Sequence, residues 1–327
     1  MSTSRYLRYK ADRRTLSIIG GWFALVAFQW IVAPRNPWIA APLIALTCAG
    51  AFLGAVATHN AVHCPVFHQR WMNNVWQVLL TLTYGHPVSS YLPGHNLSHH
   101  RHAETVRDVM RTDKARFRVN LFNLLFFTAS IGPSIMGAEI KYARFAAKRR
   151  PRFTRQLIVE TVCMVVFFGA LLALDWKKAL LYVLLPWQYA AWGIVTMNLL
   201  QHDGTDATSP WNHSRNFIGS VINWFAFNNG YHTIHHLKPT LHWSLAPEEH
   251  ARVVRPSMDP RLEEPSMIAY LARTYFVPGG RKNFDGTPRL IRDPGRDESW
   301  FTDDGPLPAT AIALTADVLP RRRVGRR

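Results

Sequence analysis

Four long apolar runs constrain the fold of this chain more than any other feature. They cover residues 16–33, 38–58, 157–174 and 179–200. Each approaches the roughly 20 residues that an α-helix needs to cross a bilayer. Backbone groups find no water inside a bilayer, so spanning segments form helices or closed barrels. Short turns at 33–37 and 175–178 join the runs in pairs. The sequence therefore predicts an all-α integral membrane protein whose four transmembrane helices form two hairpins.

The basic residues orient these helices. Lys and Arg exceed Asp and Glu by 17, and Arg5, Arg8, Lys10, Arg13 and Arg14 precede the first apolar run. Because Lys and Arg concentrate on the cytoplasmic side, we expect both hairpins to return the chain to that face. No aromatic and basic motif typical of nucleic-acid binding is present, so we expect membrane lipids and no nucleic acid as partners. The expected location is the inner membrane of a bacterium or the endoplasmic reticulum of a eukaryote.

Several segments outside the four runs are also predicted to be helical. Residues 71–84 have one broad apolar face, which suits a helix lying in the membrane interface. Residues 119–136 are apolar, but if they crossed the membrane, the histidines at 95–100 and 232–236 would lie on opposite sides of it. We expect these histidines on the same side, because they are predicted to share metal ions. We therefore expect an interfacial or re-entrant element there. A helix over residues 211–227 is expected to lie over the site.

The chain changes character near residue 250. Beyond this point it is rich in Pro, Gly and charge, with one helix expected near 263–275 and an arginine-rich end. We therefore predict two domains. Residues 1–250 form a membrane domain with a cytoplasmic histidine-rich cap, and residues 251–327 form a cytoplasmic tail.

Four polar groups fall at the predicted cytoplasmic ends of elements. They are His59 and His63; His95, His99 and His100; Asn198 and His202; and His232, His235 and His236. Spacings of three and four residues place side chains on one face of a helix. Nine imidazoles and one amide are too many for one ion, so the sequence predicts two metal ions that share a site. The cysteines are scattered and form no pair, so they do not indicate structural zinc.

Each histidine group has a simpler alternative explanation. An isolated His-x3-His pair is more often part of a polar helix face than a ligand set. The other histidines are expected on the surface or beside the site; they are His68, His86, His102, His213, His242 and His250. Asp203, Asp108 and Glu104 lie near the histidine groups and could orient ligand rings through the second N–H. The simpler reading for each of them is a solvated carboxylate.

The histidine motifs resemble those of the membrane fatty acid desaturases and hydroxylases, a superfamily of integral-membrane di-iron oxygenases. The boxes HxxxH, HxxxHH and HxxHH occur here in that order, at His59–His63, His95–His100 and His232–His236. The run from Gly230 to Pro239 also resembles the third box of that superfamily. The resemblance implies a di-iron centre ligated by all nine histidines. It also implies that Asn198 reaches a metal through water, as in acyl-CoA desaturases. No catalytic residue is expected beyond the metal ligands.

The resemblance implies an enzyme that uses O2 to desaturate a long-chain fatty acyl lipid. The sequence lacks the His-Pro-Gly-Gly signature of a cytochrome b5 segment. We therefore expect an external electron donor, either ferredoxin-like or cytochrome b5-like with its reductase. The expected substrate is a long-chain acyl or alkyl lipid.

Three alternatives stay open at this point. The same centre could hydroxylate or ketolate an alkyl, sphingolipid or carotenoid substrate. The alkane hydroxylases carry Glu before the histidine of the fourth motif, where this chain has Gln201, and they typically have six spans. A non-enzymatic membrane haem or metal carrier is an alternative of another class, and a zinc-dependent membrane hydrolase is a third.

Overall fold

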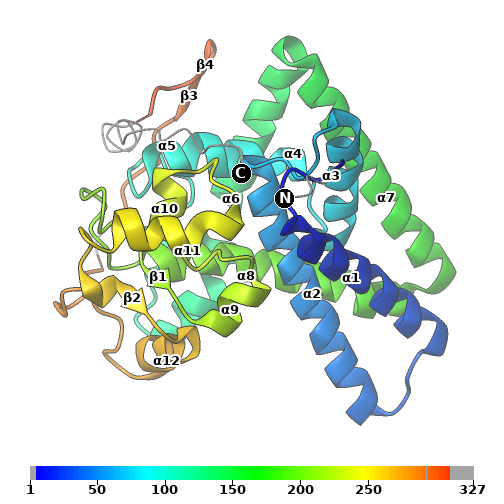
Figure 1. Ribbon diagram of the computed structural model, residues 1–327, viewed down its shortest axis with the longest axis horizontal. Coiled ribbons are helices and arrows are strands. Elements are labelled where there is room, and N and C mark those ends of the chain that lie inside the picture. Colours follow the sequence, from blue (N-terminus) through cyan, green and yellow to red (C-terminus); the bar gives the residue numbers. More distant parts are fainter. Residues whose placement is uncertain (1–4, 292, 310–327) are drawn as a thin grey trace. The chain divides into compact units, whose positions relative to one another are not determined.

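The computed structural model describes residues 5–291 and 293–309 (Figure 1). Its contacts divide the chain into two compact units. The hairpin unit comprises Tyr6–Leu92 and Lys141–Val195, and the histidine-rich unit comprises Pro93–Ile140 and the residues from Thr196 onward. The predicted boundary at residue 250 stays a prediction. The arginine-rich end lies outside the described residues.

The hairpin unit begins with two antiparallel helices, α1 (Asp12–Val32) and α2 (Pro37–His63) (Figure 1). Ala33 ends α1 in the left-handed conformation, and the Asn36 side chain caps α2 by accepting a hydrogen bond from the N–H of Trp38. Between the helices, the Trp22 indole donates to the carbonyl of Thr47 at 3.1 Å. Such pairs satisfy polar groups in an apolar setting. The predicted first hairpin is confirmed.

The second helical pair is one bent segment of 52 residues. It consists of α7 (Pro151–Ala179), a π-helical turn (Leu180–Leu184) and α8 (Leu185–His202). At a rise of about 1.5 Å per residue it would extend about 78 Å if straight, more than twice the roughly 30 Å of a bilayer core. Asp175 breaks the helix with φ −160° and ψ 97°. Its Oδ1 accepts the N–H groups of Lys177 and Lys178, both at 3.1 Å, and so starts the second arm.

The structure corrects the prediction for residues 119–136. One continuous helix, α6, runs from Asn120 to Arg149 with Pro133 inside it, so a re-entrant element is wrong. Length and composition allow it to cross a membrane. Two polar residues near the start of α6 have hydrogen-bond partners. The buried Asn123 exchanges two hydrogen bonds of 2.8 Å with the backbone of Phe117, and Asn120 donates to the carbonyl of Thr274.

The apolar helices support the predicted fold class. Among the described residues, four segments are long and apolar enough to cross a membrane: Asp12–Val32, Pro37–His63, Asn120–Arg149 and Pro151–His202. They cover the four predicted runs except for residue 33, so the mostly helical membrane fold is confirmed. The predicted helix at 71–84 is also confirmed, as α3 (Arg70–Tyr84), which packs on α2 and α7 inside the hairpin unit.

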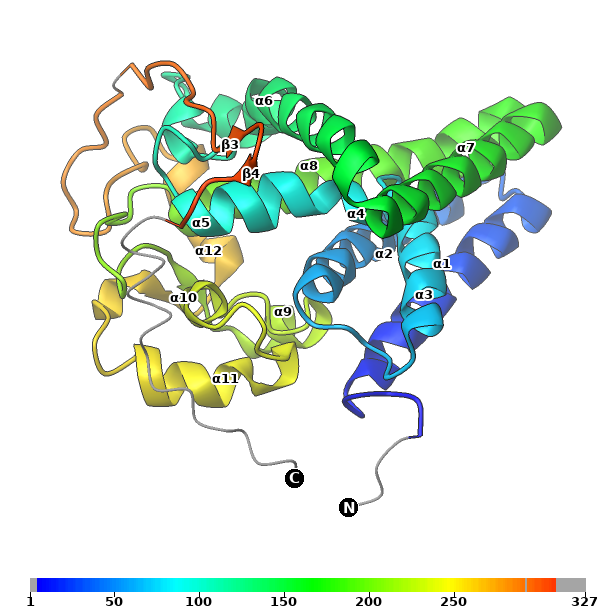
Figure 2. The same cartoon turned by 90° about the horizontal axis from the view of Figure 1, so that it is seen from above.

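Besides most of α6 and the end of α8, the histidine-rich unit contains many short elements. They are a π-helix (Pro93–His99), α5 (His100–His102), β1 (Asn216–Phe217), α9 (Ser220–Phe225), α10 (His232–Leu237), α11 (Ala246–Glu249), β2 (Glu263–Glu264), α12 (Met267–Leu271), β3 (Phe301–Thr302) and β4 (Gly305–Pro306). Figure 2 shows α10 beside α11, where Ile234, Leu237 and Ala246 form part of a small buried core. α4 (Val88–Leu92) ends the first stretch of the hairpin unit.

The helix predicted over residues 211–227 is wrong. Only α9 is helical in this stretch, and β1 pairs in parallel with β2. The side chains of Ser214 and Asn216 are buried and bond to Thr233 of the third histidine box, as described below. The segment is therefore an extended support for α10. The helix expected near 263–275 is present as α12 and the π-helical turn Ala272–Phe276.

Candidate metal centre

Four histidines of the histidine-rich unit gather their ring nitrogens in one place. They are His99, His202, His232 and His236, whose ligand atoms all lie within 4.8 Å of one another. They come from the π-helix at 93–99, the end of α8 and α10. The Nε2 of His232 lies 2.9 Å from that of His202 and 3.1 Å from that of His236.

Protons account for only part of this arrangement, because one proton on the Nε2 of His232 would have to serve both the Nε2 of His202 and the Nε2 of His236. The Nδ1 of His202 donates to the carbonyl of His213 at 2.9 Å, so the Nε2 of a neutral His202 has no proton. Burial lowers the pKa of His236 well below its ordinary value, and the neighbouring His100 and His232 lower it further, so His236 is neutral. Neutral imidazole is the form that binds metal. A cation between these nitrogens would satisfy all of them.

The spacing of the nitrogens also suits a metal. Imidazole nitrogens bind at about 2.0–2.1 Å, so two ligands at right angles are about 2.9 Å apart and two at a tetrahedral angle about 3.4 Å apart. The observed 2.9 and 3.1 Å fit right-angled coordination, as in octahedral sites, better than tetrahedral zinc.

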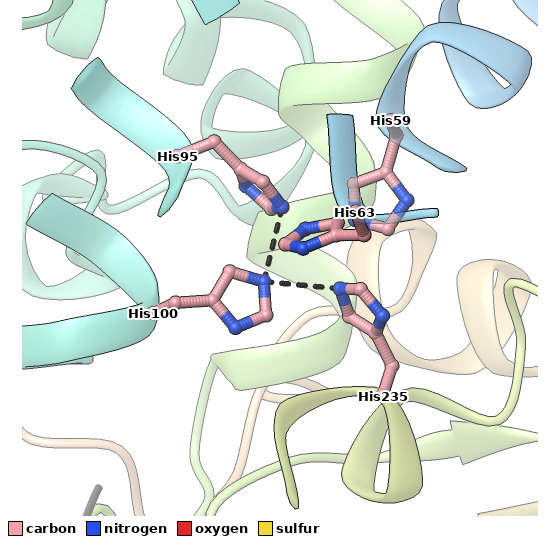
Figure 3. A group of neighbouring side chains, drawn as sticks. All are labelled: His59, His63, His95, His100 and His235. Atoms are coloured by element: carbon pink, nitrogen blue, oxygen red, sulfur yellow. Dashed lines mark hydrogen bonds between the residues drawn. The ribbon is translucent and has the colours of Figure 1, made fainter. Parts of the chain in front are cut away.

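A second group lies in the same unit. The Nε2 of His100 is 3.1 Å from the Nε2 of His95 and 3.0 Å from the Nε2 of His235 (Figure 3). His95 comes from the π-helix, His100 from α5 and His235 from α10. Adjacent histidines thus separate: His99 joins one group and His100 the other. The same division holds for His236 and His235, so the unit contains two separate groups of histidines, each able to hold a metal ion.

His59 and His63 belong to the hairpin unit. They lie in the last turn of α2, one helical turn apart, with ring centroids separated by 5.3 Å. Their predicted role as ligands beside His95, His100 and His235 stays a prediction.

The third histidine box is held in place by side chains of β1 and of the residues just before it. The Oγ1 of Thr233 accepts from the Nδ2 of Asn216 at 2.8 Å and lies 2.8 Å from the Oγ of Ser214. The Thr233 N–H donates to the Oδ1 of Asn216 at 2.9 Å. At the start of the box, a Cβ on Gly230 would lie only 2.0 Å from the carbonyl oxygen of Phe217. Glycine is therefore required at position 230, because the backbone of Phe217 approaches too closely to leave room for a side chain.

Asp108 orients one ligand ring. Its Oδ2 accepts a hydrogen bond from the Nδ1 of His99 at 2.8 Å, and both side chains are buried. The same carboxylate accepts the N–H groups of Glu104 at 2.9 Å and Met110 at 2.8 Å. The buried Nε2 of His99 has no hydrogen-bond partner within the described part of the chain. With Nδ1 protonated, this nitrogen presents a lone pair to the metal position.

The other two carboxylates have different partners. Glu104 accepts from the N–H and hydroxyl of Thr112, and its burial, together with the nearby Asp108, raises its pKa to about 8. Asp203 binds Arg281 through both oxygens at 2.6 and 2.8 Å. Burial raises the pKa of Asp203, but the guanidinium of Arg281 outweighs this and leaves it below its ordinary value. Within the described ranges, neither carboxylate hydrogen-bonds a ring of the two histidine groups, whereas Asp108 does.

Asn198 is buried, and its Nδ2 donates to the carbonyl of Met110 at 2.8 Å. Met110 follows the loop that holds Asp108, so this bond ties α8 to the loop. A water-mediated bond from Asn198 to a metal stays a prediction.

Two buried histidines were not expected as part of the site. His213 packs against His236 with ring centroids 5.2 Å apart, and burial lowers its pKa to about 4. Its Nε2 has no partner among the described residues, and neither ring nitrogen of the fully buried His102 has one. His213 therefore lies beside the site, which is one of the two expected positions, and His102 is buried and not on the surface. His102 lies three residues after His99, whereas His213 has no such spacing to a histidine box, so only its burial reveals it.

The fold and the two groups define a class: helical membrane proteins with clustered histidines able to hold metal. A profile of the Fatty acid desaturase family matches residues 36–265, and the chain belongs to this family. The region includes every histidine of both groups. The family and its named relatives place the chain in the membrane desaturase and hydroxylase superfamily.

Two curated relatives are alkane 1-monooxygenases. The protein of Ectopseudomonas oleovorans is 24% identical over 233 residues, which cover 66% of this chain and 54% of the relative. The protein of Pseudomonas putida is 25% identical over 249 residues, covering 71% of this chain and 59% of the relative. The chain thus spans a little over half the length of these relatives.

Proposed function

We propose that the chain is an O2-dependent desaturase of a long-chain fatty acyl lipid, with a di-iron centre held by histidines. The observation that supports this most directly is the separation of adjacent histidines into two groups, with ring nitrogens 2.9–3.1 Å apart in each. A single metal site would not need to divide both pairs of adjacent histidines.

The proposed ligands of one iron are His99, His202, His232 and His236, with Asn198 bound through water. The other iron takes His59, His63, His95, His100 and His235. Two irons, when bound, supply the electrons that activate O2 for removal of hydrogen from an unactivated methylene. The protein's residues hold the imidazoles neutral and oriented: burial keeps His236 unprotonated, and Asp108 keeps the proton of His99 on Nδ1. Positioning of the alkyl chain then decides which hydrogen is lost.

A second candidate is hydroxylation of an alkyl chain, which the names of the two relatives favour. Residue 201 favours desaturation over this alternative. The Nε2 of Gln201 donates to the carbonyl of Asn229 at 3.0 Å, directly before the third box. An ionised Glu, as in the alkane hydroxylases, has no proton to donate there.

The electron donor is proposed to be a separate acidic protein, ferredoxin-like or cytochrome b5-like, that reaches the centre from the cytoplasm. The excess of 17 positive charges supports such a partner, because complementary charge steers association.

Isotope labelling distinguishes the two reactions. Cells that express the chain are grown under 18O2, and their lipids and alkanes are analysed by mass spectrometry. A desaturase yields a new double bond with no label in the product, whereas a hydroxylase yields a labelled hydroxyl group. His235→Ala should abolish either product without loss of membrane insertion, and the exposed His68→Ala is the matched control. Activity retained in the His235 variant would contradict the ligand assignment.

A further inference from the structure

A large basic cleft lies entirely within the hairpin unit, which carries only two of the nine predicted ligands. It has a volume of about 1440 Å³ and is bounded by the end of α2, the start of α3 and the start of α7. Its lining includes six arginines and no Asp or Glu: Arg8, Arg70, Arg149, Arg150, Arg152 and Arg155. All six are exposed.

These arginines have no counter-charge in the described part of the chain. Arg8 donates to the carbonyl of Phe67, and Arg149 lies over the ring of Phe145 at 5.4 Å, but no carboxylate pairs with any of the six. Glu160 does not line the cleft but bonds two residues that do: its oxygens accept from the N–H and hydroxyl of Ser89 and from the side chain of Gln156. The positive charge of the cleft is therefore available to a ligand.

The surroundings of the cleft are those of a lipid site. Immediately after the arginines, α7 exposes Ile158, Val159 and Val162 by 55%, 42% and 53%. At the other wall, Trp71 is 65% exposed at the start of α3. Tryptophan beside charged residues at the end of an apolar helix is typical of the membrane interface. A ligand here would meet guanidinium groups at one end and an apolar helix face at the other.

We propose that this cleft binds the phosphate headgroup of an anionic phospholipid, whose acyl chains lie along the apolar face of α7. Guanidinium binds phosphate oxygens through paired N–H donors. The cleft is larger than the 300–1,000 Å³ or so of an ordinary small-molecule pocket, as a headgroup with the first part of its chains requires. A hollow of this kind also suits a headgroup better than the convex surface of an acidic protein. The site would make anionic lipid a structural partner of the hairpin unit.

Lipid binding to the purified chain tests this. The chain is titrated with phosphatidylglycerol or phosphatidylcholine in detergent, and bound lipid is counted by native mass spectrometry alongside thermal unfolding. The test variant is Arg152→Gln/Arg155→Gln. The matched control is Arg144→Gln/Lys148→Gln, which removes two exposed positive charges of α6 that do not line the cleft.

We expect the wild type to retain phosphatidylglycerol in preference to phosphatidylcholine and to unfold at a higher temperature with it. At about 1 kcal/mol for each basic residue near an anionic surface, the test variant should bind roughly 30-fold more weakly. The control should bind like the wild type. The proposal would be overturned if both variants lost phosphatidylglycerol binding equally, or if the wild type showed no preference for the anionic lipid.

Two further outcomes exclude other ligands. Inorganic phosphate that stabilises the chain as much as phosphatidylglycerol would refute the lipid assignment. So would an acidic ferredoxin that binds the wild type, fails to bind the Arg152/Arg155 variant and prevents lipid retention. All readouts are independent of iron and turnover, so the lipid site and the proposed reaction can fail separately.

Discussion

Replacement of Asp108 tests how the protein holds the metal that His99 would bind. The Asp108 carboxylate accepts three hydrogen bonds, two on Oδ2 from His99 and Glu104 and one on Oδ1 from Met110. In Asp108→Asn, the amide oxygen can keep the two bonds on one side, but its NH2 then faces the N–H of Met110. In Asp108→Ala, the ring of His99 loses its orienting partner altogether.

The expected effect on metal binding is graded. Loss of a partner that orients a ligand ring lowers metal affinity by about 10–100-fold, or about 1.4–2.8 kcal/mol. Because the Asn variant keeps the bond to His99 and loses its charge and the bond to Met110, we expect it near the tenfold end. The Ala variant should lie near the hundredfold end. One iron of the two should be lost first, since His100 and its group do not contact Asp108.

The assay is iron retained per chain against rising concentrations of a chelator. The control is Asp206→Asn, because the Oδ1 of Asp206 accepts from the N–H and hydroxyl of Thr208 and is not bonded to a histidine. Iron retention equal to wild type in both Asp108 variants would refute the proposed role, as would a weaker effect of Ala than of Asn.

Three further predictions concern stability and the third box. Asp203→Ala should destabilise the chain by about 3–5 kcal/mol in chemical unfolding, because it leaves Arg281 buried without its counter-charge; a change below 1 kcal/mol or so would argue against the buried pair. Since the pKa of Asp203 is lowered in the fold, its stabilisation should persist above its ordinary pKa and disappear as pH falls through the lower value. The pKa of Glu104 is raised to about 8, so its contribution is present below its ordinary value of 4.5 and is lost as pH rises to 8. Glu104→Gln should therefore flatten the fall in melting temperature across this range, and an unchanged pH profile would count against it. Gly230→Ala should lower both melting temperature and iron content, because its methyl group would overlap the carbonyl of Phe217; wild-type values for both would contradict the close approach.

The sequence predicted the helical fold because apolar runs of bilayer length have few structural solutions. It also identified the histidines that the structure gathers, since their spacing places them on helix faces. It did not predict the continuous helix over residues 120–149, in which polar residues are satisfied by partners that the sequence does not reveal. Asn123 bonds to the backbone of Phe117, and Asn120 reaches Thr274, far along the chain.

The surroundings of the metal positions were less predictable. Asp108, Glu104 and Asp203 were equivalent candidates by proximity in sequence, yet only Asp108 bonds a ligand ring. Asp203 is instead paired with Arg281, which is distant in sequence. Which carboxylate faces a ring depends on tertiary contacts, and local spacing has no information about them. The same is true of His213, whose burial comes from packing against His236.

The metal content of the purified chain tests the central claim most directly. Elemental analysis by mass spectrometry should find two irons per chain, and the absorption spectrum should show no haem band. His99→Ala and His100→Ala should each lower the iron content, because these adjacent residues belong to different groups. Zinc in place of iron, or a single metal ion that both variants remove completely, would contradict a pair of irons held by the two histidine groups.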